Sequence, residues 1–412
     1  MSTPRNEPAR TGGVREHNLA LVLRQVAQGS RTATPPSRAD IAAATGLTRA
    51  TVSSLVDVLV GAGLVEELAP VARTRAGRPA TGLALRADAV SGVGLEVNVD
   101  YLAVCVVDLT GAVRHRRVVD GDQRTRTPAT ALRRVARLGA RAIAGERATG
   151  RAVAGVTIAL PGLVQAPHGP LRLAPNLGWR DVDVVGLLTR EPTLAGLPVT
   201  IDNEADLAAL AELYAGGAGG STSFVHVSGE VGIGAGIVLD GRLYRGRHGW
   251  SGEIGHVAVR PDGPACRCGA GGCLEQYAGQ EAILRAAGVP ADAATSMGGS
   301  SAVDRIAGLA RAGHPEVRAA LAGAGAALGL VVAGAVNLLD VDTVVLGGIY
   351  APLAEWIGPA VAAEVDRRVL GAPWAPVEVR ASSVGPDAAV LGAARSVVQG
   401  VLDDPASWLT AA

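Results

Sequence analysis

The tetrad EIGH at residues 253–256, followed by GPACRCGAGGCLE at residues 263–275, carries the most information about the architecture of this chain. This segment contains one histidine and three of the four cysteines, namely His256, Cys266, Cys268 and Cys273. Three thiolates and one imidazole form a closed tetrahedral ligand set for zinc, and the glycines between them allow the chain to turn tightly around an ion. Because the set leaves no coordination position for water, it predicts a structural zinc ion rather than a catalytic one. The alternative is a group of three reduced surface thiols.

The composition indicates a multidomain protein with an aliphatic core. The chain has 412 residues, which corresponds to two to four domains at about 100–200 residues each. Of these residues, 48% are hydrophobic but only 3% are aromatic, so Val, Leu, Ile and Ala must fill the core. The N-terminus lacks the pattern of a signal peptide. The longest apolar stretch, residues 328–348, is interrupted by Asn337, Asp340 and Asp342, which predicts a buried helix and strand rather than a membrane span. We therefore expect a cytoplasmic protein.

The charge is balanced overall but unevenly distributed. All 38 basic residues are Arg, and 38 residues are acidic. Residues 1–88 carry 11 Arg and 7 acidic residues, a net charge of +4, so the remaining residues carry −4. An excess of Arg at the front of the chain favours a polyanionic partner there, although an excess this small also arises by chance.

The first 88 residues predict a disordered tail and a helical domain. Residues 1–14 are polar and rich in Pro, Gly and Arg, which is typical of disorder. Within residues 15–88, apolar residues at helical spacing are followed by a short helix over Arg38–Thr45 and a third helix from Arg49 to about Ala62. Gly46 breaks the chain between these last two helices, which is the pattern of a helix-turn-helix.

The third helix and the loop after it carry residue types that bind DNA. Polar side chains at the start of such a helix reach base edges in the major groove, and Arg makes bidentate contacts to guanine. Two apolar segments flank the loop RTRAGRP at residues 73–79, whose Arg side chains suit a narrow minor groove. The predicted DNA contacts are Thr48, Arg49, Thr51, Ser53, Ser54, Arg75 and Arg78. The alternative is a three-helix protein-binding domain with a solvated loop.

From about residue 90 strands alternate with helices, which predicts an α/β protein. The predicted strands cover residues 93–97, 103–108, 113–119, 152–160, 199–202, 223–228, 234–239 and 343–346. Helices are predicted over residues 128–144 and 204–215. A further helix over residues 322–339 is rich in small residues, so it can pack in the core or at an interface.

The zinc segment, together with these elements, resembles the ROK family, which contains bacterial sugar kinases and sugar-responsive repressors. The resemblance spans about residues 15–400, and the AGRPA wing resembles the repressor branch. It implies a winged helix-turn-helix over residues 15–88, followed by a two-lobed, actin-like sugar-kinase fold of the ribonuclease H-like type. The implied small lobe covers residues 89–200 and is completed by a C-terminal helix at about 386–402. The implied large lobe, with the zinc site, covers residues 201–385.

The resemblance also implies a sugar site. The implied sugar contacts are Gly162, Asn203, Glu204, Glu253, His256 and Glu275. Physical reasoning agrees, because a sugar presents many hydroxyl groups and needs carboxylates and amides that form several hydrogen bonds. His256 can bind zinc through one ring nitrogen and a sugar hydroxyl through the other. Taken alone, the two acids of the zinc segment could instead be solvated surface groups.

Two departures from the family's kinases predict that kinase activity is lost, so no catalytic residue is assigned. The kinases have Asp after the sugar-binding Asn, whereas Glu204, one methylene longer, follows Asn203 here. A misplacement of about 1 Å can cost on the order of a hundredfold in rate. Their first phosphate loop, Asp-x-Gly-Gly-Thr, is replaced by EVNVD at residues 96–100. Without Gly the backbone cannot approach phosphates closely, and Asp100 repels them. The glycine-rich stretch at residues 232–236 is retained.

We therefore predict a sugar-responsive transcriptional regulator, acting as a repressor, whose sugar ligand changes its affinity for a double-stranded DNA operator. A homodimer or homotetramer is expected because two wings can read a palindromic operator, and no membrane partner is expected. One alternative is an active ATP-dependent sugar kinase that also binds DNA, which predicts ADP formation with a sugar. Another is a sugar-independent DNA-binding scaffold, which predicts no thermal shift with any ligand.

Overall fold

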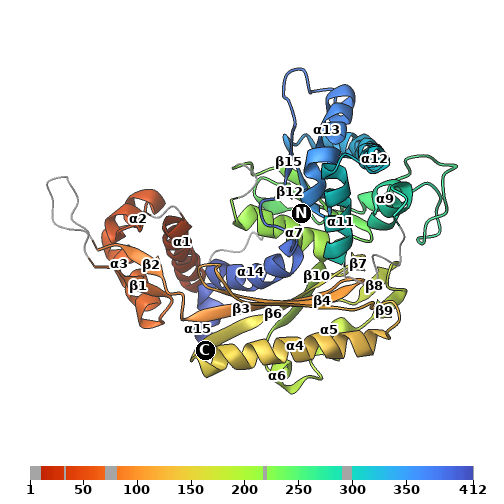
Figure 1. Cartoon of the computed structure of the whole chain (residues 1–412). Coiled ribbons are helices and arrows are strands. Elements are labelled where there is room, and N and C mark those ends of the chain that lie inside the picture. Colours follow the sequence, from red (N-terminus) through yellow and green to blue (C-terminus); the bar gives the residue numbers. More distant parts are fainter. Residues whose placement is uncertain (1–10, 32–33, 70–80, 217–219, 290–298, 412) are drawn as a thin grey trace.

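A computed structural model describes residues 11–31, 34–69, 81–216, 220–289 and 299–411 of the chain. Its N-terminal unit is a three-helix bundle closed by a two-stranded sheet (Figure 1). The helices are α1 (Thr11–Arg31), α2 (Arg38–Thr45) and α3 (Arg49–Gly61), and β1 (Val65–Glu67) pairs antiparallel with β2 (Leu83–Leu85).

The N-terminal prediction is wrong at the start of the first helix, and part of it lies outside the described residues. Helix α1 begins at Thr11, so the predicted disordered tail is wrong for residues 11–14. Once the buried side chains of α1 anchor the helix, each further residue adds a backbone hydrogen bond, and the helix extends toward the N-terminus. The predicted wing contacts Arg75 and Arg78, like residues 1–10, lie outside the described residues.

Local sequence determines the turn between α2 and α3. Ser37 and Asp40 form a capping box at the start of α2, in which the Asp40 carboxylate accepts a hydrogen bond from the Ser37 backbone N–H at 2.9 Å. Gly46 ends α2 in the left-handed conformation, with a φ of 73°. The Thr48 hydroxyl then caps α3 by accepting a hydrogen bond from the Thr51 backbone N–H at 3.1 Å. The result is a tight helix-turn-helix whose apolar face packs against α1.

The first lobe is built on a five-stranded sheet with the strand order β10-β6-β3-β4-β5. Its strands are β3 (Val90–Val97), β4 (Tyr101–Asp108), β5 (Val113–Asp120), β6 (Ala152–Leu160) and β10 (Val199–Asn203). Strands β3, β4 and β5 are antiparallel neighbours, while β6 and β10 are added in parallel beside β3. Helix α4 (Pro128–Ala148) covers one face of the sheet and α14 (Ala388–Asp403) the other (Figure 1).

The second lobe repeats this topology in the order β13-β12-β11-β14-β15. Its strands are β11 (Phe224–Gly229), β12 (Ile233–Leu239), β13 (Arg242–Leu243), β14 (Thr343–Gly348) and β15 (Glu378–Ala381). Again three antiparallel strands are followed by two parallel ones. The predicted two-lobed α/β fold is confirmed. The predicted lobe boundary at residues 200–201 falls inside β10, because that strand completes the first sheet by pairing with β6.

Smaller elements surround the two sheets. Helix α7 (Glu204–Tyr214) follows β10 directly and lies between the sheets, where it contacts α14 and β12. The first lobe also contains β7 (Leu163–Val164), β8 (Leu171–Ala174), β9 (Trp179–Val182), α5 (Val184–Leu188) and α6 (Pro192–Ala195). The second lobe also contains η1 (Ile254–His256), α8 (Glu275–Ala278), α9 (Gln280–Ala286), α11 (Gly299–Arg311), α12 (Pro315–Leu339) and α13 (Tyr350–Arg368). Helix α15 (Pro405–Ala411) packs against α14 and α1.

Glycines bring α14 into direct backbone contact with its neighbours. A Cβ at Gly94 of β3 would lie 2.2 Å from the carbonyl oxygen of Val390 in α14. A Cβ at Gly392 of α14 would lie 1.8 Å from the carbonyl oxygen of Leu207 in α7. No side chain fits at either position, so α14 rests on the backbones of both elements. The same helix shares an apolar cluster with α1.

Helix α12 is the one helix within the described residues that is long and apolar enough to cross a membrane. Half of its most apolar window is buried inside the protein. Its inner face, which includes Leu321, Leu328 and Val332, packs in the core of the second lobe. The helix begins at Pro315, seven residues before the predicted start at Ala322, because proline is well accommodated in a first helical turn.

Candidate functional site

A cleft lies between the lobes, at the carboxyl ends of β3, β6 and β10 and beside the β11–β12 hairpin. Its volume is about 500 Å³ when the open mouth is included. All six predicted sugar contacts line this cleft. The complete lining is Asn98, Val99, Pro161, Gly162, Pro175, Asn176, Asn203, Glu204, Ala205, Glu230, Gly232, Ile233, Gly234, Glu253, His256 and Glu275.

Asn203 is held by hydrogen bonds on both sides of its amide group. Its Nδ2 donates to the carbonyl oxygen of Gly162 at 2.9 Å. Its Oδ1 accepts from the backbone N–H groups of Ala205 at 2.8 Å and Asp206 at 3.2 Å, which caps α7. Gly162 has a φ of 86°, and a Cβ there would lie 2.2 Å from the carbonyl oxygen of Leu173. Glycine is therefore required in the turn that places Asn203 at the cleft wall.

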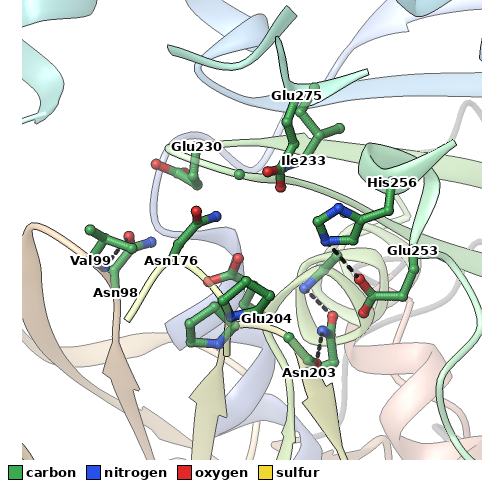
Figure 2. A pocket seen from close by; sticks show the side chains of 16 residues that line it. Asn98, Val99, Asn176, Asn203, Glu204, Glu230, Ile233, Glu253, His256 and Glu275 are labelled. Atoms are coloured by element: carbon green, nitrogen blue, oxygen red, sulfur yellow. Dashed lines mark hydrogen bonds and ion pairs between the residues drawn. The ribbon is translucent and has the colours of Figure 1, made fainter. Parts of the chain in front are cut away.

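Glu204 occupies the first turn of α7, and its carboxyl group points into the cleft (Figure 2). Burial, together with the nearby carboxyl groups of Glu96 and Glu253, raises the pKa of Glu204 to about 8. Its Oε2 has no hydrogen-bond partner among the described residues. A carboxyl group with this pKa is largely protonated near neutral pH, so Glu204 presents an O–H donor to the cleft.

The opposite wall carries two carboxyl groups and one imidazole. Nε2 of His256 lies 3.9 Å from Oε2 of Glu253. Oε1 of Glu275 accepts a hydrogen bond from the backbone N–H of Ile233 at 3.1 Å, which ties this carboxyl group to the β11–β12 hairpin. In Figure 2, the carboxyl groups of Glu204, Glu253 and Glu275 point toward one shared space. Such a ring of donors and acceptors suits a ligand with many hydroxyl groups.

The four predicted metal ligands come together beside the cleft. One ligand atom from each of His256, Cys266, Cys268 and Cys273 lies within 4.8 Å of all the others. Nδ1 of His256 is 3.9 Å from Sγ of Cys266, and the Sγ atoms of Cys268 and Cys273 are 3.7 Å apart. Two sulfurs that bind one zinc ion tetrahedrally at about 2.3 Å are separated by about 3.8 Å. The donor set and its spacing therefore fit zinc.

The turn between β3 and β4 is closed by its own side chains. Oδ1 of Asn98 accepts a hydrogen bond from the Val99 backbone N–H at 2.6 Å, and Nδ2 of Asn98 donates to the Tyr101 hydroxyl at 3.1 Å. The Tyr101 hydroxyl in turn donates to Oε1 of Glu96 at 2.6 Å. Glu96 is only 1% exposed, and burial raises its pKa to about 7. Polar side chains thus fill the turn between β3 and β4.

This end of the cleft is acidic. Glu96, Glu204 and Glu230 line a small chamber here, and burial raises the pKa of Glu230 well above its ordinary range. None of the described residues that line the chamber is basic. A triphosphate needs close backbone N–H groups and positive counter-charges, and this chamber offers carboxyl groups instead.

The predicted DNA contacts other than Arg75 and Arg78 lie at the cap and in the first turns of α3. Thr48, Arg49 and Ser54 are exposed, whereas Thr51 and Ser53 are half-buried. The hydroxyl groups of Thr48 and Thr51 lie 2.8 Å apart, so the helix cap engages both of them. Arg49 is therefore the long cationic side chain that the structure presents at this end of the helix.

Asn176 and Glu230 also line the cleft, although neither was predicted as a site residue. Asn176 lies in the loop between β8 and β9, next to Pro175, which also lines the cleft. Glu230 lies at the tip of the β11–β12 hairpin. An acidic residue between glycines in a predicted hairpin was the available signal for Glu230, whereas Asn176 carries no comparable local signal.

Comparison with known proteins gives two family matches. A model of the ROK family matches residues 92–399, and a model of the IclR helix-turn-helix domain matches residues 19–69. The xylose repressor of Caldicellulosiruptor bescii is 28% identical over 403 residues, which cover 95% of this chain and 98% of that protein. The glucokinase of Streptomyces coelicolor is 30% identical over 318 residues, which cover 73% of this chain and 96% of that protein.

A solved structure extends the likeness to three dimensions. A ROK family transcriptional regulator, described as a homologue of the Mlc protein of E. coli, superposes with a TM-score of 0.77 at 25% identity. The match covers 97% of this chain and 99% of that one. The similarity to this regulator and to the xylose repressor therefore includes both the helix-turn-helix unit and the two lobes.

Proposed function

This chain belongs to the ROK family, and we propose that it is a sugar-responsive, DNA-binding transcriptional repressor. The observation that carries the proposal is the presence, in one chain, of a helix-turn-helix unit and a cleft lined by carboxyl, amide and imidazole groups. A sugar kinase needs no helix-turn-helix unit, and a DNA-binding protein without a ligand needs no such cleft. A repressor whose ligand is a sugar uses both, and it would work where DNA is, in the cytoplasm.

In this proposal, the start of α3 enters the major groove of an operator. Arg49 and Ser54 are exposed there, and Thr48 can contact a phosphate while capping the helix. The wing residues Arg75 and Arg78, outside the described residues, would contact the minor groove. The proposal has support from the match of residues 19–69 to a helix-turn-helix domain.

The sugar would bind among the side chains that point into the cleft. Asn203 and the turn at Gly162 would form one wall, with Glu204 donating a hydrogen bond through its protonated carboxyl group. Glu253 and Glu275 would accept hydrogen bonds from sugar hydroxyls on the other wall. These groups come from different elements of both lobes, so a bound sugar would draw the lobes together.

A zinc ion at the cysteine cluster would be structural. All four positions of a tetrahedral site would be filled by His256, Cys266, Cys268 and Cys273, so none would remain for water or substrate. Bound zinc would fix the orientation of His256 and thereby aim its Nε2 at the cleft. The zinc would thus position a sugar-binding group and take no direct part in chemistry.

We propose that kinase activity is lost. A general base must accept a proton from the attacking sugar hydroxyl, and Glu204, with a pKa of about 8, is in the ionised form that can accept it in only a minority of molecules near neutral pH. The chamber beside it has no basic side chain among the described residues that line it, so it would supply no counter-charge for the triphosphate of ATP, and the Asn98 turn leaves no open phosphate loop. Both features support the loss of phosphoryl transfer.

Helix α14 supports a route from the sugar to the DNA. Asn203 caps α7, so a ligand that moves Asn203 acts on the start of that helix. The Leu207 backbone of α7 rests on Gly392 of α14, and α14 packs against α1 of the DNA-binding unit. Arg24 of α1 and Asp403 of α14 also form an ion pair at 3.6 Å. Movement of α7 would therefore reach α14 through a direct backbone contact, and the helix-turn-helix through the packed apolar side chains between α14 and α1.

The test uses the purified full-length protein with zinc retained. An operator is selected from random DNA duplexes, and a panel of neutral and phosphorylated sugars is titrated against the complex at fixed salt, because DNA affinity depends steeply on salt. We expect one sugar to change operator affinity by about tenfold or more, which corresponds to a coupling of about 1.4 kcal/mol. We also expect no ADP to form when ATP is added.

Three results would contradict the proposal. Formation of ADP with a sugar, without any selected operator, would identify a kinase. An operator whose affinity no sugar changes, with no thermal shift in the panel, would identify a sugar-independent DNA-binding protein. Failure to select any operator and absence of ADP together would remove both the repressor and the kinase.

A further inference from the structure

A second hollow adjoins the cleft on the side of α9. Its volume is about 620 Å³, against about 500 Å³ for the cleft, each with its open mouth included. Asn176 and Glu275 line both spaces, and both side chains are drawn at the cleft in Figure 2. We call this second space the α9 hollow, and its polar lining residues are Asn176, Arg267, Glu275, Gln276, Glu281 and Arg285.

Asn176 and Glu275 form the border between the cleft and the α9 hollow. A Cβ at Gly232 would lie 2.7 Å from Oε1 of Glu275 and 2.8 Å from Nδ2 of Asn176. The two side chains therefore come together over the bare backbone of Gly232, where a larger residue would displace both. Because each of them lines both spaces, each can contact a ligand on either side of the border.

Two polar side chains of the α9 hollow have no partner within the described part of the chain. Arg285, in α9, is exposed, and its guanidinium group makes no hydrogen bond or ion pair there. Gln276, in α8, is half-buried, and its side-chain amide makes no hydrogen bond there. Together they offer several N–H donors and one carbonyl acceptor to a ligand.

The other polar groups of the α9 hollow are held in place by one another. Nη2 of Arg267 donates to Oε2 of Glu281 at 3.1 Å, and its Nη1 donates to Oδ1 of Asn176 at 3.4 Å. Nη1 of Arg124 donates to Oε1 of Glu281 at 3.2 Å. Asn176 and Arg124 belong to the first lobe, so the α9 hollow, like the cleft, is formed with contacts from both lobes.

The chemistry of the α9 hollow favours a neutral group with many hydroxyls. Two guanidinium groups face two carboxyl groups, so neither an anion nor a cation meets a large excess of opposite charge. Apart from the cysteine cluster with His256, no three His, Cys, Asp or Glu side chains within the described residues bring their ligand atoms close enough together to hold a metal ion. Adjacent donors and acceptors are what sugar hydroxyls need, and an apolar group would leave them unpaired.

We propose that the α9 hollow is a subsite for a second sugar unit, so that the ligand of this protein is an oligosaccharide. The inference rests on the proposed sugar-binding function, because the first unit occupies the cleft. A hydroxyl of that unit that faces Asn176 and Glu275 lies at the border, and a glycosidic bond from it carries the second ring into the α9 hollow. Asn176 and Glu275 then contact both units, whereas Gln276 and Arg285 contact the second unit alone.

Isothermal titration calorimetry of the full-length protein with zinc retained tests the proposal. The probes are glucose and xylose, together with disaccharides of each sugar that cover the available linkage positions. We expect at least one disaccharide to bind about tenfold more tightly than its monosaccharide, a gain of about 1.4 kcal/mol.

Two variants locate the source of this gain. Arg285→Ala and, separately, Gln276→Ala are each expected to weaken disaccharide binding about fivefold, as for the loss of a hydrogen bond, and to leave monosaccharide binding unchanged. The matched control is Arg305→Ala, at an exposed residue of α11, which should keep the full gain. Circular dichroism confirms that each variant is folded, and a variant that fails to fold leaves the other to decide.

Four results would count against the α9 subsite. If no disaccharide binds more tightly than its monosaccharide, the subsite is overturned while the sugar-responsive function stands. A gain that both folded variants retain places the second unit elsewhere. Glucose 1-phosphate and glucose 6-phosphate are titrated as well, and a comparable gain that Arg285→Ala removes would identify an anion site instead. If no sugar of either length binds, the proposed function fails together with this inference.

Discussion

Replacing Glu204 by Gln should stabilise the protein increasingly as the pH rises. The ordinary pKa of a Glu side chain is 4.5, and burial beside other carboxyl groups raises that of Glu204 to about 8. Between these two values the folded state keeps a proton that the unfolded state has lost, so the free energy of unfolding falls as the pH rises. Gln has nearly the same shape and no charge, so Glu204→Gln removes this loss.

The size of the stability difference between Glu204→Gln and the wild type follows from the interval between the two pKa values of Glu204. At about 1.4 kcal/mol per pH unit, the interval from pH 4.5 to about 8 sets an upper limit of about 5 kcal/mol. Because the neighbouring carboxyl groups of Glu96 and Glu253 share the repulsion, we expect on the order of 3 kcal/mol at about pH 8.5. Near pH 4.5 the two proteins should have nearly equal stability.

Urea unfolding followed by circular dichroism at several pH values measures this difference. Glu355→Gln, at an exposed residue of α13, is the matched control and should follow the wild-type curve at every pH. If the free energy of unfolding of Glu204→Gln shows the same pH dependence as that of the wild type, Glu204 is already ionised in the folded protein. The argument that it donates a hydrogen bond to a sugar, and that it is a poor general base, would then fail.

Three further predictions concern the metal, the DNA and the sugar. Cys268→Ser should lower the zinc content, measured by atomic absorption, to well below one ion per chain. Cys105→Ser, at a buried thiol of the first lobe, should leave the zinc content unchanged. An equal loss of zinc in both variants would contradict the assignment of Cys268 as a zinc ligand. Arg49→Ala should weaken operator binding by about 1–3 kcal/mol in an anisotropy titration at fixed salt, whereas Arg141→Ala, exposed on α4, should have no effect. Asn203→Ala should lower the free energy of unfolding by about 1 kcal/mol, because the cap of α7 is lost. Calorimetry of this variant should detect no sugar binding. Normal sugar binding would show that Asn203 is not part of the sugar site.

The sequence by itself determined the parts of this protein that depend on neighbouring residues. The capping box at Ser37, the left-handed turn at Gly46 and the cap at Thr48 are local hydrogen-bonding and steric effects, so the helix-turn-helix could be predicted. The strands of both sheets follow from short apolar runs between turn residues. The four residues of the metal cluster lie within about twenty positions of one another, so their spacing already indicated a common site.

Which distant residues share an environment depends on the folded chain. Asn176 and Glu230 reach the cleft from separate loops, and no sequence pattern shows that either one lies beside Asn203. The raised pKa of Glu204 arises because folding buries it among carboxyl groups from other elements. Burial and charge proximity depend on the whole fold, and a sequence pattern does not encode them directly.

The same limit applies to α12. Its sequence is apolar on every side, which allowed either a core position or an interface. Packing against α13, α8 and α9 covers the inner side and leaves the outer side in water. Which side of a uniformly apolar helix is buried depends on its neighbours in space, and therefore only the folded structure could show which side of α12 is exposed.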